Sequence, residues 1–251
     1  MKAYFQTDQG RVRPHNEDDG GVFYNRTGQL LAIVADGMGG HQAGDVASQI
    51  AISFVRDKWE QTDGFNSSAA SETWLKEILE EANTALLAHA QNNEAYAGMG
   101  TTVVAAICTD GFIAVAHIGD SRCYMLTDEG FGQITEDHSL VNELVRSGQI
   151  SKEDAEHHPR KNVLLKALGT EKDIAADTQS MTWEWDNKLL LCSDGLTNKV
   201  TDEELSSFIQ KEQDLESVSN DMIELANDRG GEDNISLVIV HHDTATEEGE
   251  A

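Results

Sequence analysis

The stretch LLAIVADGMGGH, residues 30–41, decides the fold and raises the first question about function. Its first half, Leu30–Ala35, is a continuous apolar run with the length of a buried β-strand. The run ends in a carboxylate, Asp36, and glycine dominates the residues that follow. A buried strand that delivers an acid to an almost bare loop indicates a place where backbone and carboxylate can approach something closely.

Further apolar runs bounded by turn residues predict more buried strands. They are Thr102–Cys108, Phe112–Ile118, Cys123–Leu126, Leu189–Cys192 and Ile235–His241. Between the first two, the segment Thr109-Asp110-Gly111 predicts a hairpin connection, because Asp-Gly tolerates the positive φ that tight hairpin turns require.

Apolar side chains at helical spacing predict two long helices in the first half of the chain, one around Val46–Val55 and one around Leu75–Leu86. Shorter helices are expected at Ser139–Ser147, Ser151–His157, Glu203–Gln210 and Leu215–Asn227. The helices come in pairs between groups of strands and do not follow every strand. This order favours antiparallel sheets with helices packed outside them over a doubly wound parallel sheet.

The composition fits one sizeable domain. Of the 251 residues, 39% are hydrophobic and only two are proline, and no linker-like stretch divides the chain. We expect a single domain over residues 1–243, followed by a short disordered acidic tail at 244–251. No apolar run approaches the about 20 residues of a membrane span, and the N-terminus has no signal-peptide core.

The charge is strongly acidic, with 18 basic residues against 45 acidic residues and a net charge of −27. Such a surface repels nucleic acid and anionic membranes, and it favours a monomer. The excess acids could keep the protein soluble, or some of them could gather to bind cations, and composition does not decide between these two interpretations. Three cysteines, Cys108, Cys123 and Cys192, have spacings that fit neither a disulfide framework nor a zinc site, which favours a reducing cytoplasm.

Four aspartates occupy matching positions along the chain. Asp36, Asp120 and Asp194 each follow an apolar run and stand beside a glycine, while Asp233 shortly precedes the last run. In antiparallel packing the start of one strand lies beside the ends of its neighbours. We therefore expect these four carboxylates to reach the same rim of the core.

Carboxylates gathered at the edge of an apolar core repel one another unless cations neutralise them. Oxygen ligands suit Mg²⁺ or Mn²⁺ and argue against zinc. In this interpretation Asp36 would bridge metal ions, and the glycine-rich segment after it would form part of the metal site. An Asp-Gly after a strand is also commonly just a turn, and calcium bound for stability is a further alternative. A nucleotide cradle is excluded, because the G-x-G-x-x-G pattern breaks at Gln42 and no G-K-[ST] occurs.

Two such ions close together hold a water, lower its pKa and clamp an oxyanion, usually at phosphorus. A phosphate substrate also requires a cation outside the metal shell. The segment RVRPHNEDD, residues 11–19, offers Arg13, whose guanidinium could grip phosphate oxygens in bidentate fashion. Glu17 or Asp18 would hold water around the ions, although the segment taken alone also fits a plain charged loop.

At this point the sequence resembles a known family. The blocks GRVRPHNEDD, VADGMGGH, GMGTTVV, HIGDSRCYML, DHSLVNELVRSGQI, HPRKNVLLKALG, LLLCSDGL and GGEDNISLVIV are similar, in order, to motifs of bacterial metal-dependent serine/threonine protein phosphatases of the 2C type. The resemblance runs from about Thr7 to His241. It implies an α+β fold in which helix pairs flank an antiparallel β-sandwich on both faces, a four-layer αββα arrangement.

The resemblance also implies metal ligands. Asp36 would bridge two Mn²⁺ or Mg²⁺ ions, the Gly37 carbonyl would bind one of them, and Asp194 and Asp233 would complete the shell of the other. Asp120 would join Asp194 at a third, weaker metal site found in bacterial members. The implied reaction is hydrolysis of phosphoserine and phosphothreonine on proteins by a water or hydroxide held between the two ions.

The remaining matches concern the substrate. Arg13 matches the arginine that grips phosphate, and Glu17 and Asp18 match acids around the metal-held waters. Residues 138–166 match a mobile flap beside the cleft. The expected partners are phosphorylated proteins, including a cytoplasmic serine/threonine kinase with opposing action and its substrates.

Two departures leave roles open. Animal relatives carry histidine directly after the Asp-Gly pair, where this chain has Met38, and His41 follows three residues later. Histidine titrates near neutral pH, so His41 could donate a proton to the leaving oxygen or could only support the site. In the flap, Lys161 stands where relatives often have arginine, which keeps the charge and loses the planar fork.

Two other functions remain possible readings of the residues. One is a metal-dependent hydrolase of small phosphoesters or nucleotides, and the missing nucleotide cradle weighs against it. The other is a binding module without catalysis, which would be expected to lose the metal acids. All four aspartates are present, so the sequence favours the protein phosphatase.

Overall fold

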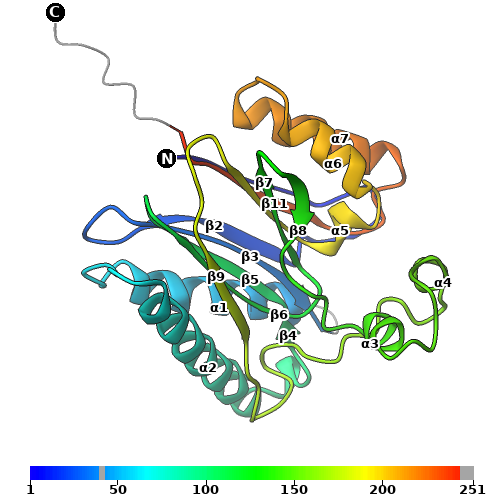
Figure 1. The fold of residues 1–251 in the computed structure, drawn as a ribbon. Helices are drawn as coiled ribbons and strands as arrows, with labels where there is room; N and C mark the ends of the chain where they lie inside the picture. The colour runs from blue at the N-terminus through cyan, green and yellow to red at the C-terminus, as the bar shows by residue number, and fades with distance from the viewer. Residues whose placement is uncertain (40–42, 244–251) are drawn as a thin grey trace, which may run out of the picture.

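The computed structural model describes residues 1–39 and 43–243, in which two antiparallel β-sheets pack face to face with helices outside them (Figure 1). The predicted α+β class with αββα layers is therefore confirmed. The predicted tail, residues 244–251, and His41 lie outside the described residues.

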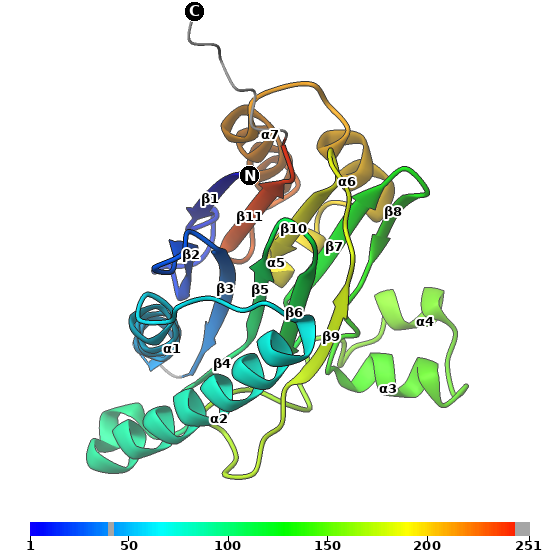
Figure 2. The same ribbon diagram turned by 60° about the vertical axis from the view of Figure 1, so that its left-hand side comes forward.

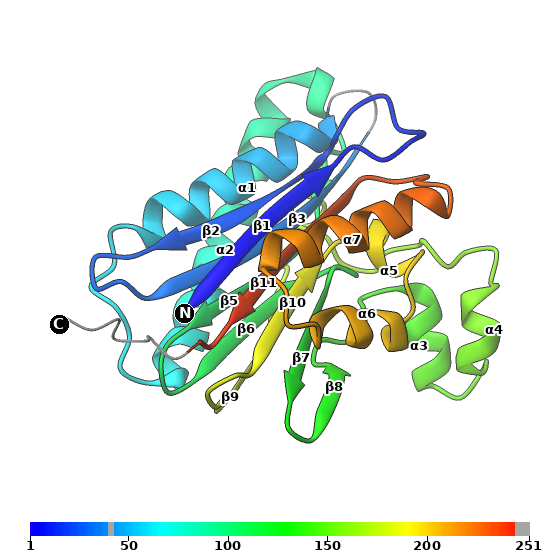
Figure 3. The same ribbon diagram turned by 90° about the horizontal axis from the view of Figure 1, so that it is seen from above.

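The strands are named in chain order. They span Lys2–Asp8 (β1), Asp18–Tyr24 (β2), Leu30–Met38 (β3), Gly100–Thr101 (β4), Val103–Cys108 (β5), Ile113–Ile118 (β6), Arg122–Thr127 (β7), Gly130–Gln133 (β8), Asp177–Met181 (β9), Lys188–Cys192 (β10) and Ile235–His241 (β11). One sheet has the order β1-β11-β10-β7-β8, and the other has the order β2-β3-β5-β6-β9 with β4 paired to β3. Seen from above, β1 and β2 lie over one another at one side of the sandwich (Figure 3).

The helices lie outside the two sheets, and two pairs of them cover the outer faces. They span Ala43–Trp59 (α1), Ser68–Asn92 (α2), Leu140–Arg146 (α3), Lys152–Glu156 (α4), Asp194–Thr197 (α5), Asp202–Ile209 (α6) and Leu215–Asp228 (α7), with a 3₁₀ turn at Glu94–Tyr96. The pair α1 and α2 covers the sheet that contains β3, and α6 and α7 cover the sheet that contains β11 (Figure 1).

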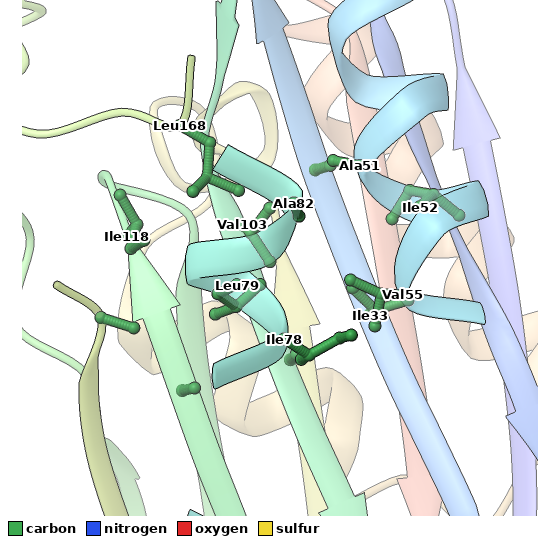
Figure 4. Close-up of a cluster of buried hydrophobic side chains, with 14 of the residues drawn as sticks. Ile33, Ala51, Ile52, Val55, Ile78, Leu79, Ala82, Val103, Ile118 and Leu168 are labelled. Atoms are coloured by element: carbon green, nitrogen blue, oxygen red, sulfur yellow. The ribbon is translucent and has the colours of Figure 1, made fainter. Parts of the chain in front are cut away.

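The central strands are buried on both faces, which explains why their sequences are continuous apolar runs. In β3, Leu31 and Ile33 pack with side chains of α1 and α2, such as Leu79 (Figure 4), while Leu30 and Val34 face the other sheet. The alternation along one strand therefore places the same run in two cores at once. Because β3 is packed on both faces, the position of its C-terminal part, which contains Asp36, is fixed by both cores.

The predicted hairpin at Thr109–Gly111 joins β5 and β6, but its turn differs from the expectation. Neither Asp110 nor Gly111 has a positive φ. Instead the hydroxyl of Thr109 accepts hydrogen bonds from the N–H groups of Gly111 (3.3 Å) and Phe112 (3.0 Å), so a side chain organises the turn.

The flap segment, which we define as residues 138–166, contains α3 and α4 and projects from the sandwich (Figure 2). Seen from above, it lies next to α6 (Figure 3). The predicted helix at Ser151–His157 is α4, and a capping box starts it, because Ser151 and Asp154 exchange hydrogen bonds there. Within the described part of the chain, no helix combines the length and the apolar character that crossing a membrane requires.

Candidate metal centre

Asp36 lies within β3 and not after its end, because the strand continues to Met38. Its backbone is held by the pair Thr101 and Thr102. The Asp36 N–H donates to the Thr102 hydroxyl (3.0 Å), and the Asp36 carbonyl accepts from the Thr102 N–H (2.9 Å) and the Thr101 hydroxyl (2.9 Å). These bonds fix the backbone from which the carboxylate extends.

Asp18 is the direct cross-strand neighbour of Asp36 in the register of β2 and β3. Its carboxylate is buried, and Oδ2 accepts a hydrogen bond from the Ser193 hydroxyl at 2.7 Å. The other oxygen, Oδ1, has no hydrogen-bond partner among the residues that the structure describes. Asp18 therefore lies deeper in the site than a residue that only holds water at its edge.

The other three acids approach the same rim from separate loops. Asp120 follows β6, Asp194 is the first residue of α5, and Asp233 stands just before β11. The Asp194 Oδ2 atom accepts from the Asn198 side chain at 2.9 Å, while Oδ1 has no partner within residues 1–39 and 43–243. Asp233 Oδ2 lies 2.8 Å from the Arg13 guanidinium.

The pKa shifts show that these carboxylates share one electrostatic environment. Burial raises the pKa of Asp36 well above its ordinary value, and the charges of Asp18, Asp194, Asp120 and Asp233 raise it further. Burial likewise raises the pKa of Asp18 to about 7 despite its hydrogen bonds, and burial and the Asp194 charge raise the pKa of Asp120 to about 7. The structure thus brings together the four predicted aspartates and Asp18.

The glycines of the site are required by close packing of backbone. A Cβ on Gly37 would meet the carbonyl oxygen of Gly44 at 2.1 Å and that of Glu17 at 2.5 Å. The Gly37 N–H also donates to the Glu17 carbonyl at 3.1 Å. A Cβ on Gly44 would in turn meet the Glu17 carboxylate. Glu17 is therefore wedged between β3 and the start of α1, at the edge of the acid cluster.

Arg13 is the cation nearest to the acids among the predicted site residues. Besides its contact with Asp233, its Nε–H donates to the Glu232 carbonyl at 3.3 Å. The Arg13 side chain is 47% exposed, so its guanidinium lies at the mouth of the site. This position lets it meet an incoming anion while it stays within reach of the carboxylates.

The donor set fits hard divalent cations. The cluster offers only oxygen atoms, and two buried carboxylate oxygens have no partner among the described residues. Burial and the neighbouring carboxylates raise the pKa values of Asp18 and Asp36, so a cation bound there would favour their charged forms. In residues 1–39 and 43–243, however, no three His, Cys, Asp or Glu side chains are arranged to hold a metal ion as they stand. Asn198, Ser193 and Arg13 each contact one oxygen of one acid, and these contacts set the present directions of the carboxylates.

A groove of about 960 Å³ runs from the acids to the flap segment. Asp120 and Asp194 belong to its lining, together with the α3–α4 region, the strands β7 and β8 with the segment that follows β8, and the residues from α5 to the start of α6. Three flap cations, Arg146, Lys152 and Lys161, face this groove. The site is therefore open to an extended molecule along one side.

Sequence reasoning missed the residues that hold the acids in place. Ser193, Asn198 and Thr102 look like ordinary polar residues in the sequence, although each stands next to a predicted motif. Asp18 was predicted as a site residue, but its pairing with Asp36 was not, because β2, with the sequence DDGGVFY, carries no long apolar run. Only the pairing of β2 with β3 in the structure places Asp18 beside Asp36.

Comparison with known proteins gives consistent matches over the whole chain. The model of the family described as protein phosphatase 2C matches residues 9–236. The serine/threonine phosphatase stp of Listeria monocytogenes is 47% identical over 243 residues, which cover 97% of this chain and 96% of that protein. The crystal structure of the serine/threonine phosphatase Stp1 from Staphylococcus aureus has a TM-score of 0.90 at 39% identity, covering 95% of this chain and 94% of that one. The catalytic domain of the serine/threonine protein phosphatase PstP was solved with two manganese ions. It matches with a TM-score of 0.83 at 32% identity, and the match covers 95% of this chain and 96% of the PstP chain.

Proposed function

This chain belongs to the protein phosphatase 2C family and is a serine/threonine protein phosphatase, and from that premise we propose how its own residues carry out the reaction. The observation that carries the proposal is a set of five carboxylates at one rim of the sandwich. Burial raises the pKa values of four of them, Asp18, Asp36, Asp120 and Asp194, and two of their oxygens have no hydrogen-bond partner among the described residues. A site of this kind is stable at neutral pH when divalent cations neutralise it.

We assign Asp36, Asp194, Asp233, the carbonyl of Gly37 and Asp120 as metal ligands, with Asp18 and Glu17 next to them. Mn²⁺ and Mg²⁺ both suit this oxygen set, and Asp120 would serve a third, weaker site. When bound, such ions supply a water of lowered pKa as nucleophile and positive charge opposite the phosphoryl oxygens. The binding of two manganese ions by PstP, at 32% identity, supports this assignment.

The chain's own residues contribute orientation. Asn198 and Ser193 restrain the carboxylates of Asp194 and Asp18, so that little reorganisation is needed during the reaction. Thr101 and Thr102 fix the backbone of Asp36. Preorganised groups of this kind lower the barrier because their ordering is complete before the substrate arrives.

We assign Arg13 to the phosphoryl group. Its planar fork matches two phosphate oxygens, and its place at the mouth of the site allows it to leave Asp233 and turn to the substrate. For the leaving serine or threonine oxygen, a proton donor is required, and His41 is our candidate from the sequence. His41 lies outside the described residues, so this role rests on its position in the motif.

The groove supports a protein substrate over a small phosphoester. It extends from Asp120 and Asp194 to Lys152 on the flap segment, far beyond what one phosphate requires. Since a polypeptide on either side of a phosphorylated residue could lie along it, we propose phosphoproteins as the substrates, including those of an opposing serine/threonine kinase. The free cysteines, all three buried, agree with a cytoplasmic location.

The experiment is phosphate release from a phosphothreonine peptide and from free nucleotides, with Mn²⁺ and with chelator, for wild type and Asp194→Ala. We expect metal-dependent release from the peptide, a loss of at least about 100-fold in the variant, and little release from nucleotides. Asp128→Ala is the matched control, because Asp128 is exposed in the β7–β8 turn. Peptide activity that survives chelation or the Asp194 substitution would contradict the mechanism, and preference for nucleotides would contradict the substrate class.

A further inference from the structure

The flap segment leaves the sandwich at His138, and this residue is bound to the loop that carries Asp120. The His138 N–H donates to the carbonyl of Gly119 at 2.9 Å, and the Gly119 N–H donates back to His138 Nδ1 at 3.1 Å. We call this reciprocal pair of hydrogen bonds the His138 clasp. Gly119 immediately precedes Asp120, so the clasp joins the flap to a candidate metal ligand through one residue.

The returning end of the flap segment is tied to the same region. The Leu165 N–H donates to the His138 carbonyl at 2.8 Å. Shortly after, Leu168 pairs with Thr101 through bonds of 2.9 Å and 3.0 Å, and Thr101 lies opposite Gly37 in the pairing of β3 and β4. His138, at the start of the flap segment, therefore contacts both the end of that segment and the loop that carries Asp120.

The imidazole of His138 is held on several sides. Its side chain is 10% exposed, and its ring stacks on His117 with centroids 4.5 Å apart. Because Nδ1 accepts from Gly119, the ring proton lies on Nε2, which faces Asp177 Oδ2 at 3.4 Å. Lys166 donates to the other oxygen of Asp177 at 3.0 Å. These contacts fix the orientation in which Nδ1 can accept.

We propose that His138 is a positioning residue of the phosphatase reaction: its clasp holds the flap wall of the groove in register with the loop that carries Asp120. The inference rests on the proposed function of the carboxylate site. His138 itself touches no substrate in this account. Loosening the clasp lets the flap wall and Asp120 move independently, so the groove and the metal site no longer present one arrangement to a phosphopeptide.

Three substitutions separate the clasp from the rest of the ring. His138→Asn places Oδ1 where Nδ1 lies and keeps an acceptor for Gly119, whereas His138→Gln places its amide near the Nε2 position and keeps only the contact with Asp177. His138→Ala removes both. We expect kcat/KM on a phosphothreonine peptide to fall by roughly tenfold or more for Ala and Gln, and to stay within about threefold of wild type for Asn.

A second readout needs no catalysis. Trypsin can cut the flap segment after Arg146, Lys152, Arg160 or Lys161, and we expect faster cleavage there for the Ala and Gln variants and wild-type rates for Asn. His241→Ala is the control. This variant also removes a histidine contact, the one between His241 and Asp186, but at the end of β11 that lies away from Asp233. It should change neither kcat/KM nor flap cleavage.

Wild-type kcat/KM and flap cleavage in the Ala and Gln variants would overturn the proposal. An Asn variant as impaired as Gln, at equal melting temperature, would also overturn it, because the acceptor at Nδ1 would then be irrelevant. If the Ala variant does not fold, the comparison of Asn with Gln decides. A wild type inactive on every phosphopeptide would refute the proposed function, while the cleavage rates would still test the clasp.

Discussion

At the scale of single residues, close approach and not backbone conformation explains Gly37 of the VADGMGGH stretch, whereas Gly39 has a positive φ of 152°. Gly37 has no positive φ, yet its missing Cβ leaves room for the carbonyl oxygens of Gly44 and Glu17. The bare segment thus lets β3, the N-terminal loop and the start of α1 meet beside Asp36. The sequence pattern predicted the need for glycine, and the structure supplies a steric reason.

Gly37→Ala should therefore destabilise the protein and displace Asp36. We expect the free energy of unfolding to fall by roughly 1–3 kcal/mol, as for other insertions into a packed interior, and phosphatase activity to fall with it. Urea unfolding followed by circular dichroism measures the first effect. Gly132→Ala is the control, since nothing lies within 4 Å of a Cβ there. Equal stability of the two variants would contradict the steric account.

At the scale of elements, the buried strands were predictable and the edge strands were not. The apolar runs predicted β3, β5, β6, β7, β10 and β11 to within a few residues. Of the strands that the apolar runs missed, β1, β2, β8 and β9 are the four edges of the two sheets, and β4 is a two-residue strand paired to β3. An edge strand is covered on fewer sides, so its sequence does not need a continuous apolar run. Since Asp18 belongs to β2, its pairing with Asp36 could not be predicted either.

The start of α6 is another element fixed by contacts across the chain. The Glu204 carboxylate accepts a hydrogen bond from the Thr201 N–H in a capping box. It also accepts hydrogen bonds from Nη1 and Nη2 of Arg229, at the end of α7, each 2.6 Å long. The hydrogen bonds from Arg229, and then those from Thr201, lower the pKa of Glu204 to about 2. A lowered carboxylate pKa contributes stability above the ordinary value of 4.5, and this contribution is lost as the pH falls toward 2.

Glu204→Gln should therefore lower the melting temperature at pH 7, and the difference from wild type should shrink steadily as the pH falls below 4.5. Thermal unfolding at several pH values measures it. Glu203→Gln changes the neighbouring exposed acid of the same helix turn and should have little effect at any pH. A difference between wild type and Glu204→Gln that stays constant with pH would show that the ion pair is not its source.

At the scale of the whole molecule, the charge of −27 acts on stability as well as on partners. Like charges on a compact surface repel, and salt screens them, with a Debye length that falls from about 30 Å at 0.01 M to about 3 Å at 1 M. We expect the melting temperature of chelator-treated protein to rise with sodium chloride over this range. A melting temperature that falls or stays flat would mean that local ion pairs outweigh the net repulsion.

The central claim is that the acids at one rim of the sandwich form a metal centre, and calorimetric titration with Mn²⁺ tests it most directly. The account predicts at least two ions per chain for wild type, because the proposed chemistry needs a pair. Asp36→Asn should lose both ions, since Asp36 would bridge them, while Asp128→Asn, in the exposed β7–β8 turn, should bind as wild type does. Unchanged Mn²⁺ binding by Asp36→Asn would contradict the account.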